Sequence, residues 1–176
     1  MFVTSHALSG VLIGNALGGH PLAALATGVA SHLVLDAVPH WGCDMGRPGG
    51  PEQFLRAARW DGVLGVAVLA TATVSVDPRV RAATVAAMAG AVLLDLDKPM
   101  GHFFGIEPFP RVVNRLHARV QRESPDGLRR EFGYGIAMAV ADVVVAIRAR
   151  RLTRRIEPPG TRFARLGVDS GAAGSS

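Results

Sequence analysis

The residues best suited to chemistry are a histidine and an aspartate, four positions apart, near the end of an uncharged apolar stretch. His32 and Asp36 lie in the sequence Ser31-His-Leu-Val-Leu-Asp-Ala-Val-Pro-His40. This spacing places two side chains on the same face of a helix. Ionisable groups at membrane depth are costly to bury and usually serve a function. We expect His32 and Asp36 to bind a metal ion or to act in catalysis; the alternative is a hydrogen bond that ties two helices together.

Three further histidines are candidates to join this pair. His6 begins the first apolar stretch, and His40 follows the proline that ends the helix carrying Asp36. His117 lies on the basic segment 109–121. The alternative for His6 is a surface histidine at a helix N-terminus, and the alternative for His117 is an ordinary interfacial histidine. We expect all three to be metal ligands.

Two aspartates close the fourth apolar stretch, in Leu94-Asp-Leu-Asp-Lys-Pro99. Carboxylates at the C-terminal end of a helix oppose its dipole, so Asp95 and Asp97 indicate a nearby cation. That cation is either a metal ion or Lys98. We expect Asp95 to be a metal ligand, and we expect the catalytic carboxylates, one of them a general base, to be Asp36 and Asp97.

Five apolar stretches must position these residues. They cover residues 2–17, 22–38, 62–76, 80–94 and 133–147. No Asp, Glu, Lys or Arg occurs from Met1 to Leu35, which is the strongest indication of a membrane environment. Each stretch is short against the ~20 residues that usually span the hydrocarbon. The sequence predicts an all-α fold, a helical integral membrane bundle of four to five short transmembrane helices; the alternative is a soluble helical bundle.

The remaining segments complete this organisation. Asp61 is interpreted as the N-cap of the third helix, and Asp142 as a hydrogen-bonding group between helices. Segment 109–121 is amphipathic and basic, which predicts an interfacial helix on anionic lipid. We expect one helical membrane domain over residues 1–156 and a disordered C-terminal tail over residues 157–176.

The charge distribution indicates lipid partners. The net charge is +5, and nearly all the positive charge is arginine that flanks the apolar stretches. We therefore expect contacts with membrane lipid, and with anionic headgroups at the Arg-rich loops. A nucleic-acid partner is excluded because the arginines do not interleave with exposed aromatic residues. Mean hydropathy is +0.27, and the apolar residues are concentrated in blocks of small side chains that let helices approach closely.

Arginine placement also predicts an orientation. The loops after the second and fourth stretches are rich in Arg and the first hairpin turn has none, which places the N-terminus and those loops in the cytoplasm. Arg79, Arg81 and the Arg-rich residues after position 147 disagree with this rule. Stretch 133–147 therefore either crosses the membrane or re-enters it. The predicted location is the cell membrane, with several passes.

This topology gathers most of the candidate residues at the cytoplasmic end of the bundle. They are His6, Asp36, His40, Asp61, Asp95, Asp97, His102 and His117. A mixed nitrogen and oxygen ligand set fits a divalent metal ion such as Zn²⁺, Mn²⁺ or Fe, and differs from a closed structural zinc site. Such an ion lowers the pKa of a bound water and polarises a phosphoryl or carbonyl group.

Phosphate-binding loops, dinucleotide fingerprints and nucleophile elbows are absent from the sequence.

The motifs resemble those of the YdjM-like family of membrane-bound, metal-dependent hydrolases. The resemblance rests on the early His6, on Ser31-His-Leu-Val-Leu-Asp36 and on Leu94-Asp-Leu-Asp-Lys-Pro99, in short patches over about a third of the chain. The order of the two longer motifs is reversed here, and Lys98 stands where the family has a histidine. The resemblance implies several transmembrane helices and a metal site that includes His6, His32, Asp36, Asp95 and Asp97.

Two functions of a membrane protein compete at this point, beside the alternative of a soluble helical phosphodiesterase, which predicts extraction from cells without detergent. The first is a membrane-embedded metal-dependent hydrolase that acts on a phosphoester or a lipid at the cytoplasmic face. The second is a non-enzymatic membrane protein in which the same residues link helices or carry protons or metal ions. Substitution of His32 and Asp36 distinguishes the two, because only the first function predicts the loss of an activity together with the metal.

Overall fold

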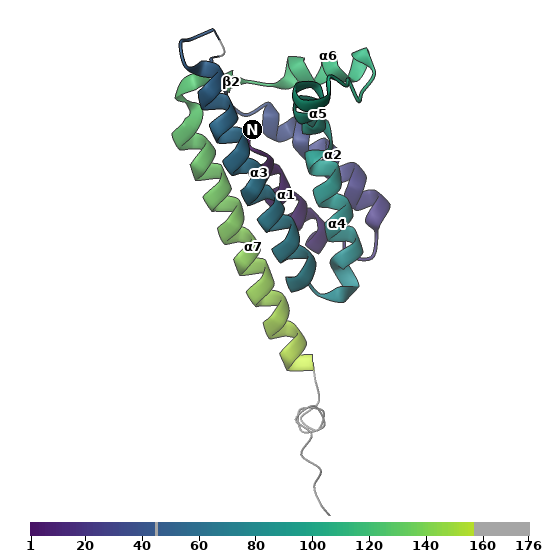
Figure 1. Ribbon diagram of the computed structural model, residues 1–176. Coiled ribbons are helices and arrows are strands. Elements are labelled where there is room, and N and C mark those ends of the chain that lie inside the picture. The colour runs from purple at the N-terminus through teal and green to yellow at the C-terminus, as the bar shows by residue number, and fades with distance from the viewer. Residues whose placement is uncertain (45, 157–176) are drawn as a thin grey trace, which may run out of the picture.

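The computed structural model describes residues 1–44 and 46–156 (Figure 1), so the predicted tail, residues 157–176, lies outside the described residues. The described chain is mainly helical, which confirms the all-α prediction. The helices are α1 (Val3–Ala16), α2 (Pro21–Asp36), α3 (Gly50–Ser75), α4 (Pro78–Val92), α5 (Asp97–Phe104), α6 (Arg111–Val120) and α7 (Leu128–Ile156). Two short 3₁₀ turns, η1 (Leu93–Leu96) and η2 (Pro125–Gly127), join them.

Each predicted apolar stretch corresponds to one long helix, but two helices extend well beyond their stretch. The third helix begins at Gly50 rather than near residue 62, after Gly49 in a left-handed conformation with φ 77°. Residues 50–61 are too polar to mark a helix by hydrophobicity, yet they continue α3 without a break. Asp61 therefore lies inside α3, and its interpretation as the N-cap of that helix is wrong.

The centre of the bundle is α4 packed against both α1 and α2. Small residues make this contact close. A Cβ added to Gly28 would lie 2.3 Å from the backbone oxygen of Ala87, and one added to Gly90 would lie 2.2 Å from that of Leu25. Neither position has room for a side chain, so α2 and α4 touch backbone to backbone. The core around them is built largely from alanine and other small side chains.

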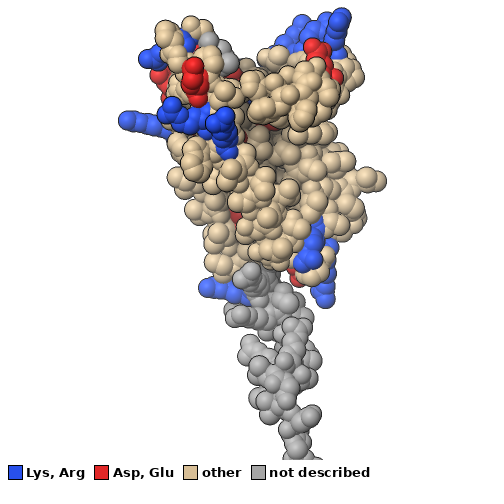
Figure 2. Space-filling view, in the orientation of Figure 1, with Lys and Arg blue, Asp and Glu red and all other residues tan. Residues whose placement is uncertain are grey.

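Helices α3 and α7 contact α1 and leave much of their own surface uncovered. Exposed apolar side chains on α3 include Val63, Val66 and Val74, and those on α7 include Ile136 and Val140. Figure 2 shows the charged side chains of this face gathered mainly toward the two ends of the molecule. By length and composition, one helix among the described residues, α3, could cross a membrane.

The segment after α5 is tied back to the end of α2. Strand β1 (His40–Trp41) pairs in parallel with β2 (Glu123–Ser124). The backbone N–H of Arg122 donates to the carbonyl of Asp36 at 3.0 Å, and His40 N–H donates to the carbonyl of Arg122 at 3.1 Å. These bonds hold α6 over the C-terminal end of α2. Figure 1 shows α5 and α6 at the same end of the bundle as the N-terminus.

Candidate metal centre

Five buried side chains from four parts of the fold converge at this end of the bundle. His6 comes from α1, His32 and Asp36 from α2, Asp95 from η1 and His117 from α6. The exposed fraction is 0% for His6, His32 and Asp36, and 4% for Asp95 and His117. Donor atoms of His6, His32 and Asp36, and likewise those of His32, Asp95 and His117, lie within 4.8 Å of one another. We call these five residues the His/Asp cluster.

Asp36 lies at the centre of the His/Asp cluster. Its Oδ1 is 3.2 Å from Nε2 of His6, and its Oδ2 is 3.2 Å from Nε2 of His32 and 3.1 Å from Nε2 of His117. The Nε2 atoms of His32 and His117 are 3.0 Å apart. Asp95 Oδ2 lies 3.7 Å from Nε2 of His6. Three imidazoles therefore direct the same ring nitrogen at two carboxylates.

Contacts outside the centre fix which nitrogen carries the proton. Nδ1 of His32 is 2.7 Å from the carbonyl oxygen of Ala91, which can only accept, so this nitrogen donates. When His32 is neutral, its Nε2 is then an unprotonated acceptor. Nδ1 of His117 faces Asp97 Oδ2 at 3.5 Å, which favours the same tautomer. A carbonyl or carboxylate behind the ring is the usual support of a metal-binding histidine.

Two carboxylates from other helices hold the start of α1 and so position His6. Asp61 accepts hydrogen bonds from the N–H groups of Val3 and Thr4 at 2.7 and 3.0 Å. Glu131, which is 1% exposed, accepts from Phe2 N–H at 2.8 Å. The first N–H groups of a helix have no partner within the helix, and negative charge there is favourable. Asp61 thus caps α1 from α3, one turn before His6.

Asp36 also accepts two contacts from within the chain. The ammonium group of Met1 is 2.9 Å from Oδ1, and the side-chain amide of Gln121 donates to Oδ2 at 3.3 Å. Gln121 lies one helical turn beyond His117. The rings of His6 and His32 stack with their centroids 4.0 Å apart. The cluster is therefore packed tightly, and each ring has a restricted orientation.

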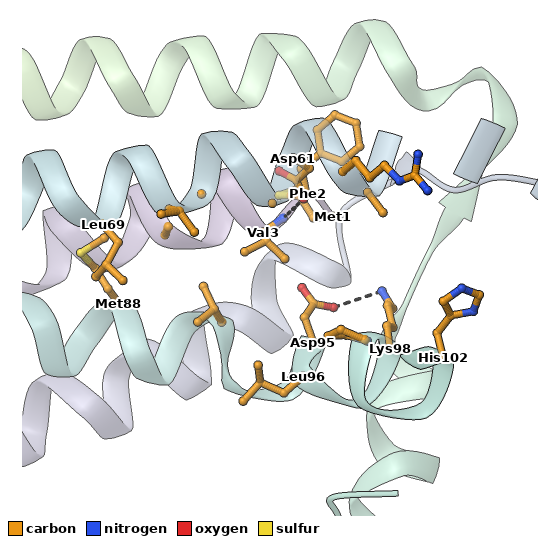
Figure 3. Close-up of a pocket in the computed structure, with 18 of the residues that line it drawn as sticks. Met1, Phe2, Val3, Asp61, Leu69, Met88, Asp95, Leu96, Lys98 and His102 are labelled. Atoms are coloured by element: carbon orange, nitrogen blue, oxygen red, sulfur yellow. Dashed lines mark hydrogen bonds and ion pairs between the residues drawn. The ribbon is translucent and has the colours of Figure 1, made fainter. Parts of the chain in front are cut away.

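Asp95 is the member of the cluster that also faces open space. It lines a cavity of about 730 Å³ between α3 and α4 (Figure 3). Lys98 Nζ lies 3.1 Å from Asp95 Oδ1. Burial would raise the pKa of Asp95, but Lys98 and the nearby histidines hold it below its usual value. Asp95 is thus a carboxylate that can contact both a metal ion and a ligand in the cavity.

The pKa of His117 is raised to about 9, because the ring hydrogen-bonds to Asp36 and then to Asp97. A protonated His117 satisfies the negative charge around it as a metal ion would. This ring therefore holds a proton at neutral pH when no metal competes for Nε2.

The structure brings together five of the predicted site residues and places two elsewhere. His40 is fully buried and donates from Nδ1 to the carbonyl of Val38 at 2.8 Å, outside the groups whose donor atoms converge. Asp97 contacts His117 from the side away from Asp36. Its predicted catalytic role, like that of Asp36, stays a prediction. Neither carboxylate oxygen of Asp142 has a hydrogen-bond partner among the described residues, so its predicted link between helices is not found there.

Sequence reasoning missed the two polar residues that support the cluster, Gln121 and Glu131. Each carried a signal. Gln121 follows His117 by four positions, which places both on one helix face. Glu131 is a carboxylate two residues before the last apolar stretch, and Asp61 directly precedes the third.

The donor set suits a divalent metal ion. Metal–ligand bonds of about 2.0–2.2 Å place neighbouring ligand atoms roughly 3.0–3.5 Å apart. The close contacts between donor atoms of the cluster run from 3.0 to 3.7 Å, and in each of the two groups of three all donor atoms lie within 4.8 Å. No protein-family model, curated protein or solved structure matches this chain. The interpretation of the cluster therefore depends on its own geometry.

Proposed function

We propose that this chain is an integral membrane protein that binds a divalent metal ion in the His/Asp cluster and hydrolyses a phosphoester. The observation that carries the proposal is the orientation of the three imidazoles. Each directs Nε2 toward carboxylate oxygens, and His32 donates its Nδ1 proton to the Ala91 carbonyl. In neutral His32 the unprotonated Nε2 lies 3.2 Å from Asp36 Oδ2, and an unprotonated nitrogen and a carboxylate repel each other unless a cation lies between them.

The proposed ligands are His6, His32, Asp36, Asp95 and His117. Imidazole and carboxylate together suit Zn²⁺ or Mn²⁺ better than Ca²⁺ or Mg²⁺, which prefer oxygen. A bound ion of this kind supplies a Lewis acid for a phosphoryl oxygen and lowers the pKa of water. Ala91 and Asp97 would orient His32 and His117 from behind.

The chain's own residues support hydrolysis on the cavity side of the cluster. Asp95 lines the cavity and can accept a proton from an attacking water. Lys98, which also lines the cavity, can neutralise a phosphoryl oxygen. Burial would lower the pKa of Lys98, but the Asp95 carboxylate raises it overall, so the ammonium form persists at neutral pH. Asp36, with no exposed surface, is better placed as a ligand than as a base.

Exposed apolar side chains support the membrane part of the proposal. Leu22 on α2, Val74 on α3 and Ile136 on α7 are 81%, 76% and 64% exposed. Together with many similar residues they form more apolar surface than a soluble monomer usually carries. In the proposed arrangement, α3 and α7 face lipid and shield the shorter α1. The cluster then lies near one membrane surface, beside the basic helix α6.

A non-enzymatic function has one specific observation in its favour. The Met1 ammonium and the Gln121 amide already contact Asp36, so hydrogen bonds alone can link α2 to α1 and α6. Under that alternative the cluster is a structural tie. It would need no metal, and changes to it would alter stability alone.

The test is the metal content of the full chain purified in detergent, before and after incubation with Zn²⁺ or Mn²⁺. His32→Gln is compared with His20→Gln, an exposed histidine at a helix start away from the cluster. We expect about one metal ion per chain in the parent and in the His20 variant, and little in the His32 variant. Phosphoester hydrolysis should be present in the two proteins that bind metal and lost in the His32 variant. Absence of metal from the parent would refute the proposal, and extraction from cells without detergent would refute its membrane part.

A further inference from the structure

The cavity beside the His/Asp cluster is long and unequal at its two ends. It lies between α3 and α4, which touch each other far less than α1 and α4 do. Figure 3 shows Leu69 and Met88 at one end, and Asp95, Lys98 and His102 toward the other. From Asp61 to Leu69 the α3 wall runs for about 12 Å, at 1.5 Å per residue. The cavity volume, about 730 Å³, is in the usual range for small-molecule sites.

The walls of this cavity are almost entirely apolar away from the cluster. They are formed by Val66, Leu69, Val85 and Met88, among others. The polar groups gather at the cluster end, where Lys98 and Arg59 bring positive charge beside two carboxylates. Asp95 belongs to the cluster, and Asp61 is already bonded to the N–H groups of Val3 and Thr4. A ligand that fits both parts has an apolar chain and an anionic head.

The cavity also opens onto the apolar surface of the molecule. Val66 and Phe103 line it and are each 67% exposed, and Leu69, also lining it, is 42% exposed. An occupant can therefore enter sideways from a lipid phase. A small polar phosphoester would gain no binding free energy from these apolar walls, because it has no apolar surface to bury.

We infer that this cavity holds the acyl chain of a phospholipid and places the lipid's phosphate at the His/Asp cluster. The inference rests on the proposed hydrolase function and names its substrate class, a phosphoester lipid. Hydrolysis adds water across one P–O bond: the water oxygen bonds to phosphorus, and the departing alkoxide oxygen takes a proton. Lys98 and Arg59 bind the anionic head, and the α3 and α4 side chains bind the chain.

Gly62 offers a way to fill the cavity without disturbing the cluster. It lines the cavity on α3, and a Cβ added there would meet no atom within 4 Å. Gly62→Leu therefore projects a side chain into open space where the acyl chain would lie. Gly133→Leu is the matched control, because Gly133 is an exposed helical glycine on α7, also with open space, and does not line the cavity. Ala89→Leu fills the cavity from the opposite wall, on α4.

The experiment uses the full chain reconstituted in phosphatidylcholine vesicles that contain phosphatidic acid with a photoreactive group in its acyl chain. After illumination, we expect labelled peptides from α3 and α4. Gly62→Leu and Ala89→Leu should each lower this labelling by about fifteenfold. That is roughly the loss expected when two methylenes, worth about fourfold each, are displaced. Gly133→Leu should label as the parent does.

Metal analysis of the same samples separates this inference from the proposed function. Bound metal in all variants, with labelling of α3 and α4 that Gly62→Leu and Ala89→Leu leave unchanged, would overturn the acyl-chain site and leave the metal centre intact. Labelling elsewhere, or cross-linking of cavity residues to a second copy of the chain, would also overturn it. If Gly62→Leu lowers the labelling but no sample contains bound metal, the acyl-chain site stands and the proposed function is refuted.

Discussion

Replacing Gly28 by alanine tests whether close contact between α2 and α4 sets the geometry of the His/Asp cluster. Gly28 lies one helical turn before His32. The added Cβ would lie 2.3 Å from the Ala87 oxygen and 2.9 Å from the Ala91 nitrogen, against 3.4 Å or more for an ordinary contact. Both are backbone atoms, so the helices must separate by about 1 Å.

Separating α2 from α4 lengthens the hydrogen bond between His32 and the Ala91 carbonyl, which orients the His32 ring. The distance from Nδ1 of His32 to the Ala91 oxygen is 2.7 Å, and a shift of about 1 Å would carry it beyond hydrogen-bonding range. Loss of a hydrogen bond behind a metal-binding histidine typically lowers metal affinity 10–100-fold. Forcing an extra group into a packed core also costs about 1–3 kcal/mol of folding free energy.

The assay is competition for Zn²⁺ against a chromophoric chelator, with thermal unfolding measured on the same samples. Gly133→Ala is the control, because its Cβ meets nothing within 4 Å. We expect Gly28→Ala to bind Zn²⁺ at least about tenfold more weakly, while Gly133→Ala binds as the parent does. Parent-like affinity in a folded Gly28→Ala protein would refute the idea that this helix contact positions His32.

Two further predictions follow from contacts around the cluster. Asp61→Asn removes the charge that caps α1 and turns an amide donor toward the helix N–H groups. It should lower the free energy of unfolding by about 0.5–2 kcal/mol and weaken metal binding through His6. The control is Asp126→Asn, a change at an exposed residue, which should have neither effect. Denaturant unfolding and metal titration check both effects, and equal stability of the two variants would contradict the cap. Because the pKa of metal-free His117 is raised to about 9, metal must displace its proton below that pH. Apparent Zn²⁺ affinity should therefore rise with pH up to about 9. The slope of log affinity against pH should be greater in the parent than in His117→Gln by one proton released per metal ion bound. Equal slopes in the two proteins would contradict this prediction.

The helices and the end of the bundle where the candidates gather were predictable because both follow from local patterns. The four-residue spacing of His32 and Asp36 fixes a common face, and Pro39 fixes where the helix ends. Short hairpins between apolar stretches then bring His6 and Asp95 to the same end as Asp36. Those arguments need only the period of a helix and the alternation of its direction.

The capping of α1 could not be predicted in this way. Asp61 has the sequence context of a local N-cap, but the helix starts at Gly50 and the carboxylate serves a different helix 57 residues away in sequence. Capping needs any nearby carboxylate, and tertiary structure decides which one is near. The same holds for His40, whose position after Pro39 resembles that of a ligand. Its backbone pairs with β2, and its ring turns to the Val38 carbonyl.

The most direct test of the metal centre is X-ray absorption spectroscopy of the full chain loaded with one equivalent of Zn²⁺. The His/Asp cluster predicts nitrogen and oxygen ligands at about 2.0–2.2 Å, with the multiple-scattering signal of about three imidazoles. That signal should weaken in His6→Gln and stay unchanged in His20→Gln. A spectrum of hydrated zinc, with oxygen ligands alone, would contradict the account. Sulfur ligation through Cys43 would contradict it equally.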